Sequence, residues 1–197
     1  PKASISARDA VRDTEEAATA AANGLLISNH SYGVPIFNQS GTQQVNSANI
    51  GAYTSQAQDW DRVVFNAPYY LAVMSAGNEG GILSGYSDGL ANGYDKLTGD
   101  KTAKNTLVVA SAVPIMSSGK LNNFLSSQFS SEGPTDDFRI KPDITGDGNL
   151  LFSSTSGSIN EYNTFQGTSM ASPSVSGSLL LLQEYYNQLN ANYMKAA

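Results

Sequence analysis

The residues best suited to carry chemistry lie in one short segment that precedes a long apolar stretch. This segment reads Gly167-Thr168-Ser169-Met170-Ala171-Ser172-Pro173. A helix beginning here would place the hydroxyl of Ser169 at a helix N-terminus, where unpaired backbone N–H groups and the helix dipole favour negative charge. Gly167 allows close approach of the backbone, and Pro173 is tolerated in the first turn of such a helix. A serine in this position can equally cap the helix, so these features alone leave both interpretations open.

A second polar segment, residues 75–80, follows an apolar run and contains Asn78. An asparagine just before two glycines is typical of a turn. Beside a nucleophilic serine, the side-chain amide of Asn78 could instead donate a hydrogen bond to a developing oxyanion. A third polar segment, residues 28–33, holds the only histidine of the chain, His30. A lone histidine is a weak indication of catalysis, so no catalytic role is assigned to His30.

The composition of the chain excludes several classes of site. The 197 residues are 40% hydrophobic and 14% charged, which is enough apolar material for a sizeable core. A net charge of −6 argues against a protein that binds nucleic acid through phosphates. The absence of cysteine excludes disulfides, thiolate metal sites and a cysteine nucleophile, and a single histidine excludes a polyhistidine metal centre. No apolar stretch is long enough to span a membrane.

The elements that position these segments are predicted from apolar runs and from the turn signals beside them. Helices are predicted over residues 13–22, 59–66 and 171–189. Strands are predicted over residues 25–28, 69–74 and 106–113, with a loop over 34–58. The strands are almost continuously apolar, as a parallel sheet covered on both faces requires, and they alternate with helices. The predicted fold class is therefore α/β, with residues 1–197 as a single unit.

Local signals predict where some of these elements begin and end. Asp13 or Thr14 is predicted to cap the first helix, and Asn23-Gly24 to end it. Pro114 is predicted to end the third strand. The last helix is apolar over most of its circumference, which predicts that it is buried.

Segment 167–173 closely resembles the nucleophile motif of the subtilisin-like serine peptidases, the subtilases. Four further segments resemble landmarks of that family and occur in its order: the substrate-binding strand at 28–33, the oxyanion-hole segment at 75–80, and two later landmarks at 129–134 and 141–144. The landmarks cover about residues 25–185. The resemblance implies a mostly parallel, doubly wound sheet of the subtilisin-like type. It also implies that this chain is the C-terminal two-thirds of the peptidase domain, without the N-terminal strands.

The resemblance implies a catalytic role for two residues. Ser169 would be the nucleophile that attacks a peptide carbonyl and forms an acyl-enzyme. The backbone N–H of Ser169 and the side-chain amide of Asn78 would donate hydrogen bonds to the oxyanion. The predicted function is that of a serine endopeptidase.

The resemblance also implies where a peptide substrate lies. Ser31, Tyr32 and Gly33 would offer backbone groups to an extended substrate strand. Ala76 and Gly77 would line the pocket for the side chain that precedes the scissile bond. A peptide or protein is therefore the expected partner.

The chain departs from the family in lacking the motifs of the catalytic aspartate and histidine. Neither Asp-Thr-Gly, Asp-Ser-Gly nor His-Gly-Thr occurs, although a serine hydroxyl needs a histidine to take its proton. Asp-Gly pairs begin at Asp88 and Asp147, but both follow the oxyanion segment, which is the wrong order. The resemblance implies that His30 occupies a position that faces the core or the far side of the strand.

Residues 1–5 resemble the stretch that follows the catalytic-histidine helix in many subtilases. We therefore expect the chain to begin after the half that carries both missing residues, and to be inactive alone. Uncovered strand edges would then pair with the missing N-terminal part of the domain, or with a second copy. An alternative is a non-catalytic, peptide-binding pseudo-peptidase of the same fold.

Expectations for cofactors and location rest on the resemblance alone. No cofactor is identifiable from the sequence. Calcium is possible by family resemblance, but carboxylates do not cluster at ligand spacing, and no metal site is assigned. Asp143 and Asp147 are instead predicted as turn and strand-end residues. A secreted or otherwise extracytoplasmic protein of bacterial type is expected, with neither nucleic acid nor membrane as a partner.

Overall fold

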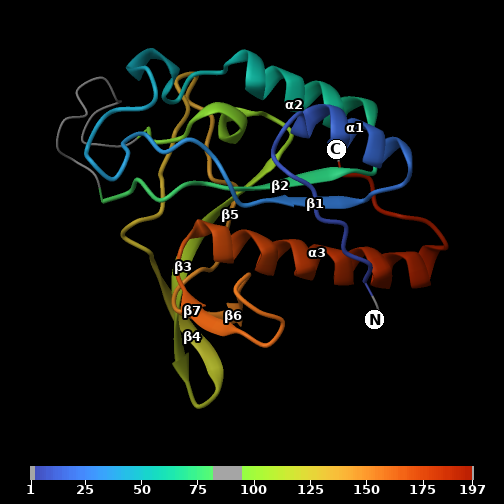
Figure 1. Cartoon of the computed structure of the whole chain (residues 1–197). Coiled ribbons are helices and arrows are strands. Elements are labelled where there is room, and N and C mark those ends of the chain that lie inside the picture. The colour runs from blue at the N-terminus through green and yellow to red at the C-terminus, as the bar shows by residue number, and fades with distance from the viewer. Residues whose placement is uncertain (1–2, 82–94, 197) are drawn as a thin grey trace.

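The structure is a computed structural model that describes residues 3–81 and 95–196. Its α-helices are α1 (Asp13–Ala22), α2 (Ser55–Asn66) and α3 (Thr168–Asn190) (Figure 1). Short 3-10 helices are η1 (Ser47–Asn49) and η3 (Gly99–Thr102). The strands are β1 (Ile27–His30), β2 (Leu71–Ser75), β3 (Leu107–Ser117), β4 (Lys120–Ser126), β5 (Ile144–Asp147), β6 (Leu151–Ser154) and β7 (Tyr162–Phe165). The Asp88-Gly89 pair lies outside the described residues.

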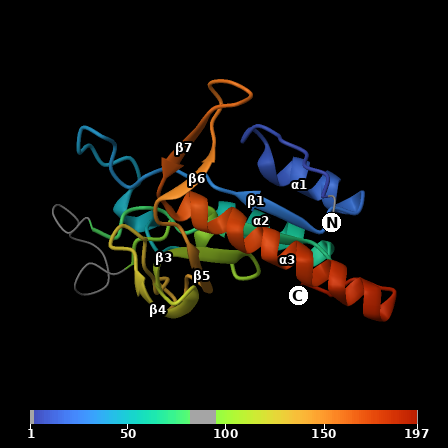
Figure 2. The ribbon, with the colours of Figure 1, turned by 90° about the horizontal axis from the view of Figure 1, so that it is seen from below.

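The main sheet has the order β1-β2-β3-β4, and β5 also pairs with β3. Strands β1, β2, β3 and β5 are parallel, and only β4 is antiparallel to its neighbour. Strands β6 and β7 form a separate hairpin just before α3 (Figure 2). The mostly parallel α/β fold predicted from the sequence is thus confirmed. Among the helices that the structure describes, none is long and apolar enough to cross a membrane.

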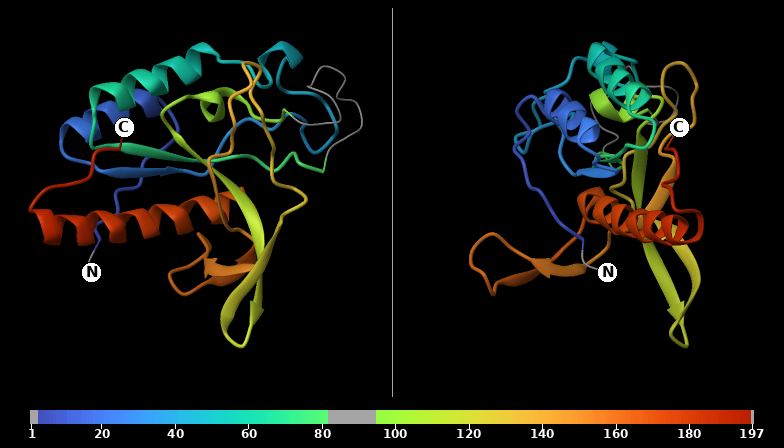
Figure 3. Two further views of the ribbon diagram at one scale, coloured as in Figure 1. Left: turned by 180° about the vertical axis from the view of Figure 1, so that it is seen from behind. Right: turned by 90° about the vertical axis from the view of Figure 1, so that its right-hand side faces the viewer.

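Helices cover the sheet on both faces, with α1 and α2 on one side and α3 on the other (Figure 3). Side chains alternate along each strand, so neighbouring residues of β2 enter different cores. Met74 packs with Trp60 and Tyr70 beneath α1 and α2. Val73 packs with Val175 of α3.

The helix predicted over 13–22 is confirmed as α1, but its cap is not. Arg12, in the left-handed conformation at φ 57°, is the N-cap residue instead of Asp13 or Thr14. The predicted stop at Asn23-Gly24 is correct, because Gly24 has φ +92° at the turn that ends the helix. The second helix begins at Ser55 instead of residue 59, inside the predicted loop 34–58, since Ala57 belongs to its buried face.

The first two strands lie two residues later than their predicted starts. Pairing in β1–β2 runs from Ile27 opposite Leu71 to His30 opposite Met74. Tyr70 N–H donates to the carbonyl of Ala67 at 2.9 Å, so Tyr70 belongs to a turn instead of the strand. Apolar character alone could not reveal this register, because the apolar residues before each strand pack at its amino end.

Pro114 does not end the third strand, which continues to Ser117. The β5 ladder along β3 ends with Ala112 opposite Asp147, and Pro114 pairs only with Phe124 of β4. A proline is accommodated here because its missing N–H lies beyond the part of β3 that needs two neighbours.

The prediction that the last helix is buried is wrong over its second half. Val175 is buried, but Leu180, Leu182 and Tyr186 are exposed. Leu181 is 55% exposed and Leu189 is 66% exposed. The sheet is narrower than the helix is long, so only one stripe of α3 finds apolar partners in the described chain.

Candidate active site

The start of α3 brings Ser169 against the segment that follows β1. Ser169 Oγ donates to the carbonyl of Ser31 at 3.3 Å. In return, Ser31 Oγ donates to the carbonyl of Ser169 at 3.0 Å. Two segments 138 residues apart in the sequence are therefore joined by reciprocal hydrogen bonds. The predicted nucleophile and the predicted substrate segment lie side by side.

Pro173 explains why the carbonyl of Ser169 is available. The helix begins at Thr168, so Pro173 lies in the second turn and not in the first turn as predicted. A helical residue four positions after Ser169 would normally donate to the Ser169 carbonyl, but proline has no N–H. The hydroxyl of Ser31 replaces the missing donor.

Asn29 and Ser172 extend this connection between β1 and α3. Ser172 Oγ donates to Asn29 Oδ1 at 2.8 Å. Asn29 Nδ2 donates to Ser31 Oγ at 2.9 Å, which leaves the hydroxyl hydrogen of Ser31 for Ser169. No role was predicted for Asn29 from the sequence. The available signal was its place in segment 28–33, which resembles the family's substrate-binding strand.

Asn78 lies after β2, with its side-chain oxygen held at the first residue of α3. Thr168 donates to Asn78 Oδ1 through its backbone N–H at 2.9 Å and through its hydroxyl at 3.1 Å. Because the oxygen takes both donors, the Nδ2 group of the same amide is turned away from Thr168. The amide nitrogen is thus the atom of this side chain that could donate a hydrogen bond to a bound group.

Two candidate oxyanion donors lie near one another beside Gly167. A Cβ atom built on Gly167 would lie 3.4 Å from Asn78 Nδ2 and 3.7 Å from the backbone nitrogen of Ser169. Gly167 has φ +148°, a conformation that favours glycine. A small oxygen between these donors could accept from both, which is the arrangement that stabilises a tetrahedral intermediate.

Ala76 and Gly77 connect β2 to Asn78 and are held by the segment around Ser131. Gly77 N–H donates to Thr168 Oγ1 at 3.1 Å, and Ser131 N–H donates to the Gly77 carbonyl at 2.9 Å. Glu79 N–H donates to Ser131 Oγ at 3.0 Å. Burial raises the pKa of the Glu79 carboxyl. The landmark at 129–134 therefore supports the oxyanion segment from behind.

Tyr32 and Gly33 continue the segment beyond Ser31 and contact a buried lysine. Lys101 Nζ donates to the carbonyl of Tyr32 at 3.0 Å and to Asp100 Oδ1 at 2.6 Å. Sequence reasoning did not single out Lys101, because it lies 69 residues from Tyr32 within no recognisable motif.

His30 points away from Ser169, into the core beneath α2. Asn29 faces α3, so its neighbour His30 must face the opposite side of the strand. The ring of His30 meets the ring of Trp60 edge-on, with centroids 4.6 Å apart. Its Nε2 bonds to Ser28 Oγ at 2.6 Å, and burial lowers the imidazole pKa. The expectation that His30 faces the core is confirmed.

Asp147 is a strand-end residue, as predicted, whereas Asp143 lies just before β5 and in no turn. Asp143 Oδ2 accepts from the backbone of Val108 and from Lys141 Nζ, each at 2.7 Å. Asp147 is the last residue of β5 and accepts from Asn149 N–H at 3.1 Å. Within residues 3–81 and 95–196, no group of three or more metal-ligating side chains comes together.

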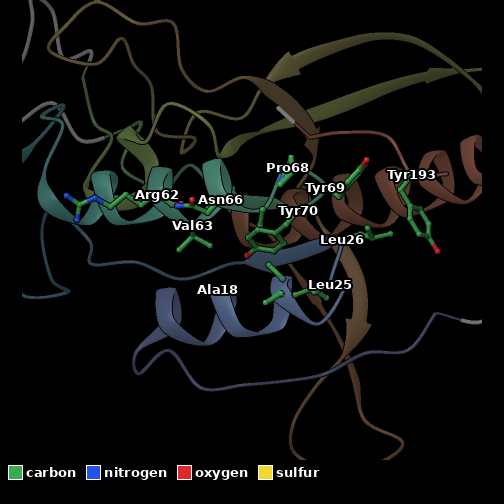
Figure 4. Close-up of a pocket in the computed structure, with 14 residues that line it drawn as sticks. Ala18, Leu25, Leu26, Arg62, Val63, Asn66, Pro68, Tyr69, Tyr70 and Tyr193 are labelled. Atoms are coloured by element: carbon green, nitrogen blue, oxygen red, sulfur yellow. The ribbon is translucent and has the colours of Figure 1, made fainter.

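A cavity of about 640 Å³ lies at the other end of the parallel strands. Figure 4 shows Leu25, Leu26, Tyr69 and Tyr70 around it, all of which precede β1 or β2. The candidate active site is instead at the carboxyl ends of these strands, where ligands of open α/β sheets bind. The cavity is therefore separate from the site.

Comparison with known proteins finds a family whose model matches almost the whole chain. A model of the subtilase family matches residues 4–197. The PII-type proteinase of Lactococcus lactis subsp. cremoris is 33% identical over 105 residues, which are 50% of this chain and 5% of that protein. The C5a peptidase of Streptococcus pyogenes is 47% identical over 60 residues, or 30% of this chain and 5% of that protein. The matches thus span only a small part of these relatives.

Solved structures share the fold at low sequence identity. The prenylagaramide maturation protease PagA aligns over 99% of this chain and 56% of its own, with a TM-score of 0.59 and 17% identity. The PatG macrocyclase in complex with peptide aligns over 94% of this chain and 44% of its own, with a TM-score of 0.62 and 15% identity. Each of these solved chains is considerably longer than the region that aligns.

Proposed function

Because the chain belongs to the subtilase family, we propose that it forms the nucleophile-bearing part of a serine endopeptidase. The observation that carries this proposal is the convergence at one point of Ser169, the Asn78 amide and the segment after β1. A helix cap would need the serine alone. It would not need a second donor whose orientation Thr168 fixes.

The chemistry begins with attack of Ser169 Oγ on the carbonyl carbon of a peptide bond. The hydroxyl proton passes to a histidine, and the carbonyl oxygen becomes an oxyanion that accepts from Asn78 Nδ2 and Ser169 N–H. The intermediate collapses by expelling the amine, which takes the proton from the histidine. Water then hydrolyses the acyl-enzyme by the same path, and Ser169 is regenerated.

The base must come from polypeptide other than this chain. His30 is the only histidine, and it is bonded to Ser28 and Tyr32 on the opposite side of β1. We propose that a further part of the same catalytic domain supplies the histidine and its aspartate. This chain alone is then inactive or nearly so.

Substrate binds along residues 31–33, whose backbone offers hydrogen bonds to an extended peptide. Ala76 and Gly77, placed between β2 and Asn78, line the pocket for the side chain before the scissile bond. The family resemblance supports both assignments, and it alone supports an extracytoplasmic location.

The exposed face of α3 supports the proposal that another part of the domain covers this chain. Leu181, Tyr185 and Leu189 are each more than half exposed on this helix. Strand β1 pairs only with β2, so its outer edge is open in the described chain. Apolar helix faces and strand edges of this kind are normally covered. A second copy of the chain is the competing occupant.

A non-catalytic, peptide-binding protein of the same fold is the alternative, and the position of the lone histidine favours it. Labelling by a fluorophosphonate probe distinguishes the two. We expect the full-length protein to be labelled, Ser169→Ala to remain unlabelled, and this chain alone to react far more slowly. A folded full-length protein that binds peptides but resists the probe would establish the alternative.

A further inference from the structure

The candidate substrate segment, residues 31–33, lies beyond the paired part of its strand. The β1–β2 ladder ends with His30 opposite Met74, so the sheet does not hold the backbone of the next three residues. A segment that must accept a peptide strand along one side needs support from its other side. Side chains from elsewhere in the chain supply that support.

Lys101 provides a donor to the backbone of this segment. Its Nζ donates to the Tyr32 carbonyl at 3.0 Å. Asp100 Oδ1 accepts from the same ammonium at 2.6 Å, and both side chains are buried, with exposed fractions of 4% and 6%. A buried ammonium that is paired with a carboxylate has a fixed position. It also donates a stronger hydrogen bond than an exposed lysine does.

Two carbonyls of the segment accept hydrogen bonds from different elements. Ser31 O accepts from Ser169 Oγ of α3, whereas Tyr32 O accepts from Lys101 of η3. Successive carbonyls of an extended chain point to opposite sides. Lys101 therefore binds the side of the segment that is turned away from Ser169. Because it occupies the Tyr32 carbonyl, only Ser31 and Gly33 of the three predicted residues keep their carbonyl side for a substrate.

Gly33 is fitted to this lysine. A Cβ atom at position 33 would lie 2.9 Å from Lys101 Nζ and 3.1 Å from its Cε. Gly33 does not have a positive φ, so its lack of a side chain is explained by the space that the ammonium occupies.

The side chain of Tyr32 is anchored independently. Its hydroxyl donates to Asp13 Oδ2 at 3.0 Å, so it must accept from His30 Nδ1 at 2.6 Å. In the neutral imidazole, a hydrogen on Nδ1 makes Nε2 the acceptor of the hydrogen bond from Ser28 Oγ. Tyr32 is therefore held both through its phenol and through its carbonyl.

We propose that Lys101 is a positioning residue that holds segment 31–33 in the conformation required to bind a peptide strand. This inference rests on the proposed peptidase function and deepens it. Asp100 acts through Lys101 by fixing its ammonium. Neither residue touches the reacting atoms, so the effect is on binding of extended substrates and not on the chemical step.

The test compares two substrates of the full-length protein. A tetrapeptide nitroanilide reaches along segment 31–33, whereas an N-acetyl amino-acid ester ends before it. For Lys101→Met we expect KM for the tetrapeptide to rise about tenfold, the loss of one hydrogen bond to a charged group. The rate on the ester and the rate of fluorophosphonate labelling should change less than twofold.

Two further variants cover the case that Lys101→Met leaves Asp100 buried without its partner and fails to fold. Asp100→Asn combined with Lys101→Met removes both charges and should show the same KM effect. Gly33→Ala should displace the ammonium and raise KM for the tetrapeptide. Its effect should shrink in the Lys101→Met background, because the shorter side chain leaves room for the new methyl group. Lys120→Met, which removes an exposed lysine at the start of β4, is the matched control and should leave both substrates unaffected.

The outcomes separate this inference from the peptidase assignment. Equal losses on tetrapeptide and ester, or no loss on either, overturn the positioning role while the wild-type activity stands. Independent effects of Gly33→Ala and Lys101→Met also overturn it. A wild-type protein that cleaves neither substrate and resists the probe overturns the peptidase assignment, and the inference with it.

Discussion

The two faces of the main sheet differ in how completely they are covered. Beneath α1 and α2, the core contains fully buried large side chains such as Trp60, Tyr70 and Met74. Beneath α3, the core is a small cluster around Val73, Val109 and Val175. The helix that carries the candidate nucleophile therefore has the less extensive core.

The extent of burial also differs along α3 itself, and not only between the two faces of the sheet. At its first turns the helix is tightly packed and hydrogen-bonded, with Thr168, Ala171 and Ser172 fully buried. Past Leu179 its leucines are exposed. Precise placement of a reactive side chain needs a rigid environment only at the site itself. The rest of the face remains available for another part of the protein.

The largest effect is expected from breaking the well-covered face. Trp60→Ala should lower the free energy of unfolding by about 3–5 kcal/mol, because it removes a fully buried ring. Urea denaturation would measure the change. Phe65→Ala on the exposed side of the same helix is the control and should change stability by less than about 0.5 kcal/mol. Similar losses in both variants would contradict the assignment of the core.

A smaller loss is expected where the sheet meets the start of α3. A Cβ on Gly146 of β5 would lie 2.8 Å from the Ala171 carbonyl, so Gly146→Ala should cost about 1–3 kcal/mol through overpacking. Gly177→Ala further along the helix meets nothing within 4 Å and should stabilise the chain by about 0.5–1 kcal/mol. Changes of opposite sign in the free energy of unfolding, measured by denaturation, would support a helix that is closely packed at one end only.

A smaller change in the free energy of unfolding is expected when the pH is lowered, because His30 is buried beneath α2 on the well-covered face. Burial lowers the folded-state pKa of His30 below its ordinary value of 6.5, although Asp100 and Asp13 oppose this. The unfolded chain then binds the proton more readily than the folded chain. Stability from this group is complete above pH 6.5 and declines as pH falls through the folded-state pKa. His30→Gln should flatten this slope in urea midpoints measured from pH 7 to 5, and an unchanged slope would count against it.

The smallest effect on stability is expected at the exposed end of α3. Leu181→Ser should change the free energy of unfolding by less than about 0.5 kcal/mol, because this side chain is already 55% exposed. The same variant should reduce binding of a hydrophobic dye and any self-association of the chain, as measured by sedimentation. A loss comparable to that of Trp60→Ala would mean that this face is covered within the chain itself.

The sequence predicted the fold class and the bounds of α1, because both depend on local patterns. It misplaced β1 and β2 by two residues, since their register is set by contacts between distant segments. Pro114 was misjudged for a related reason. Whether a strand tolerates proline depends on whether it pairs on both edges at that residue, and at Pro114 strand β3 pairs with β4 alone. The burial of α3 was misjudged because an apolar pattern shows which side chains favour burial, but it does not show which other segment buries them.

For the candidate site, motif residues such as Ser169 and Asn78 could be chosen from the sequence, but their supports could not. Lys101 lies in no motif, and its importance follows only from the atom it meets, the carbonyl of Tyr32. Asn29 lies within segment 28–33, which was singled out from the sequence. Its hydrogen bond with Ser172, however, depends on the packing of β1 against α3.

The proline in the second turn of α3 couples two positions that evolution could otherwise vary separately. Because Pro173 offers no N–H, the Ser169 carbonyl accepts the hydroxyl of Ser31 instead. A substitution at 173 that restores the N–H would supply a competing donor, and a substitution at 31 would leave the carbonyl without one. Among homologous sequences, residues 31 and 173 should therefore covary, with proline retained wherever the hydroxyl is.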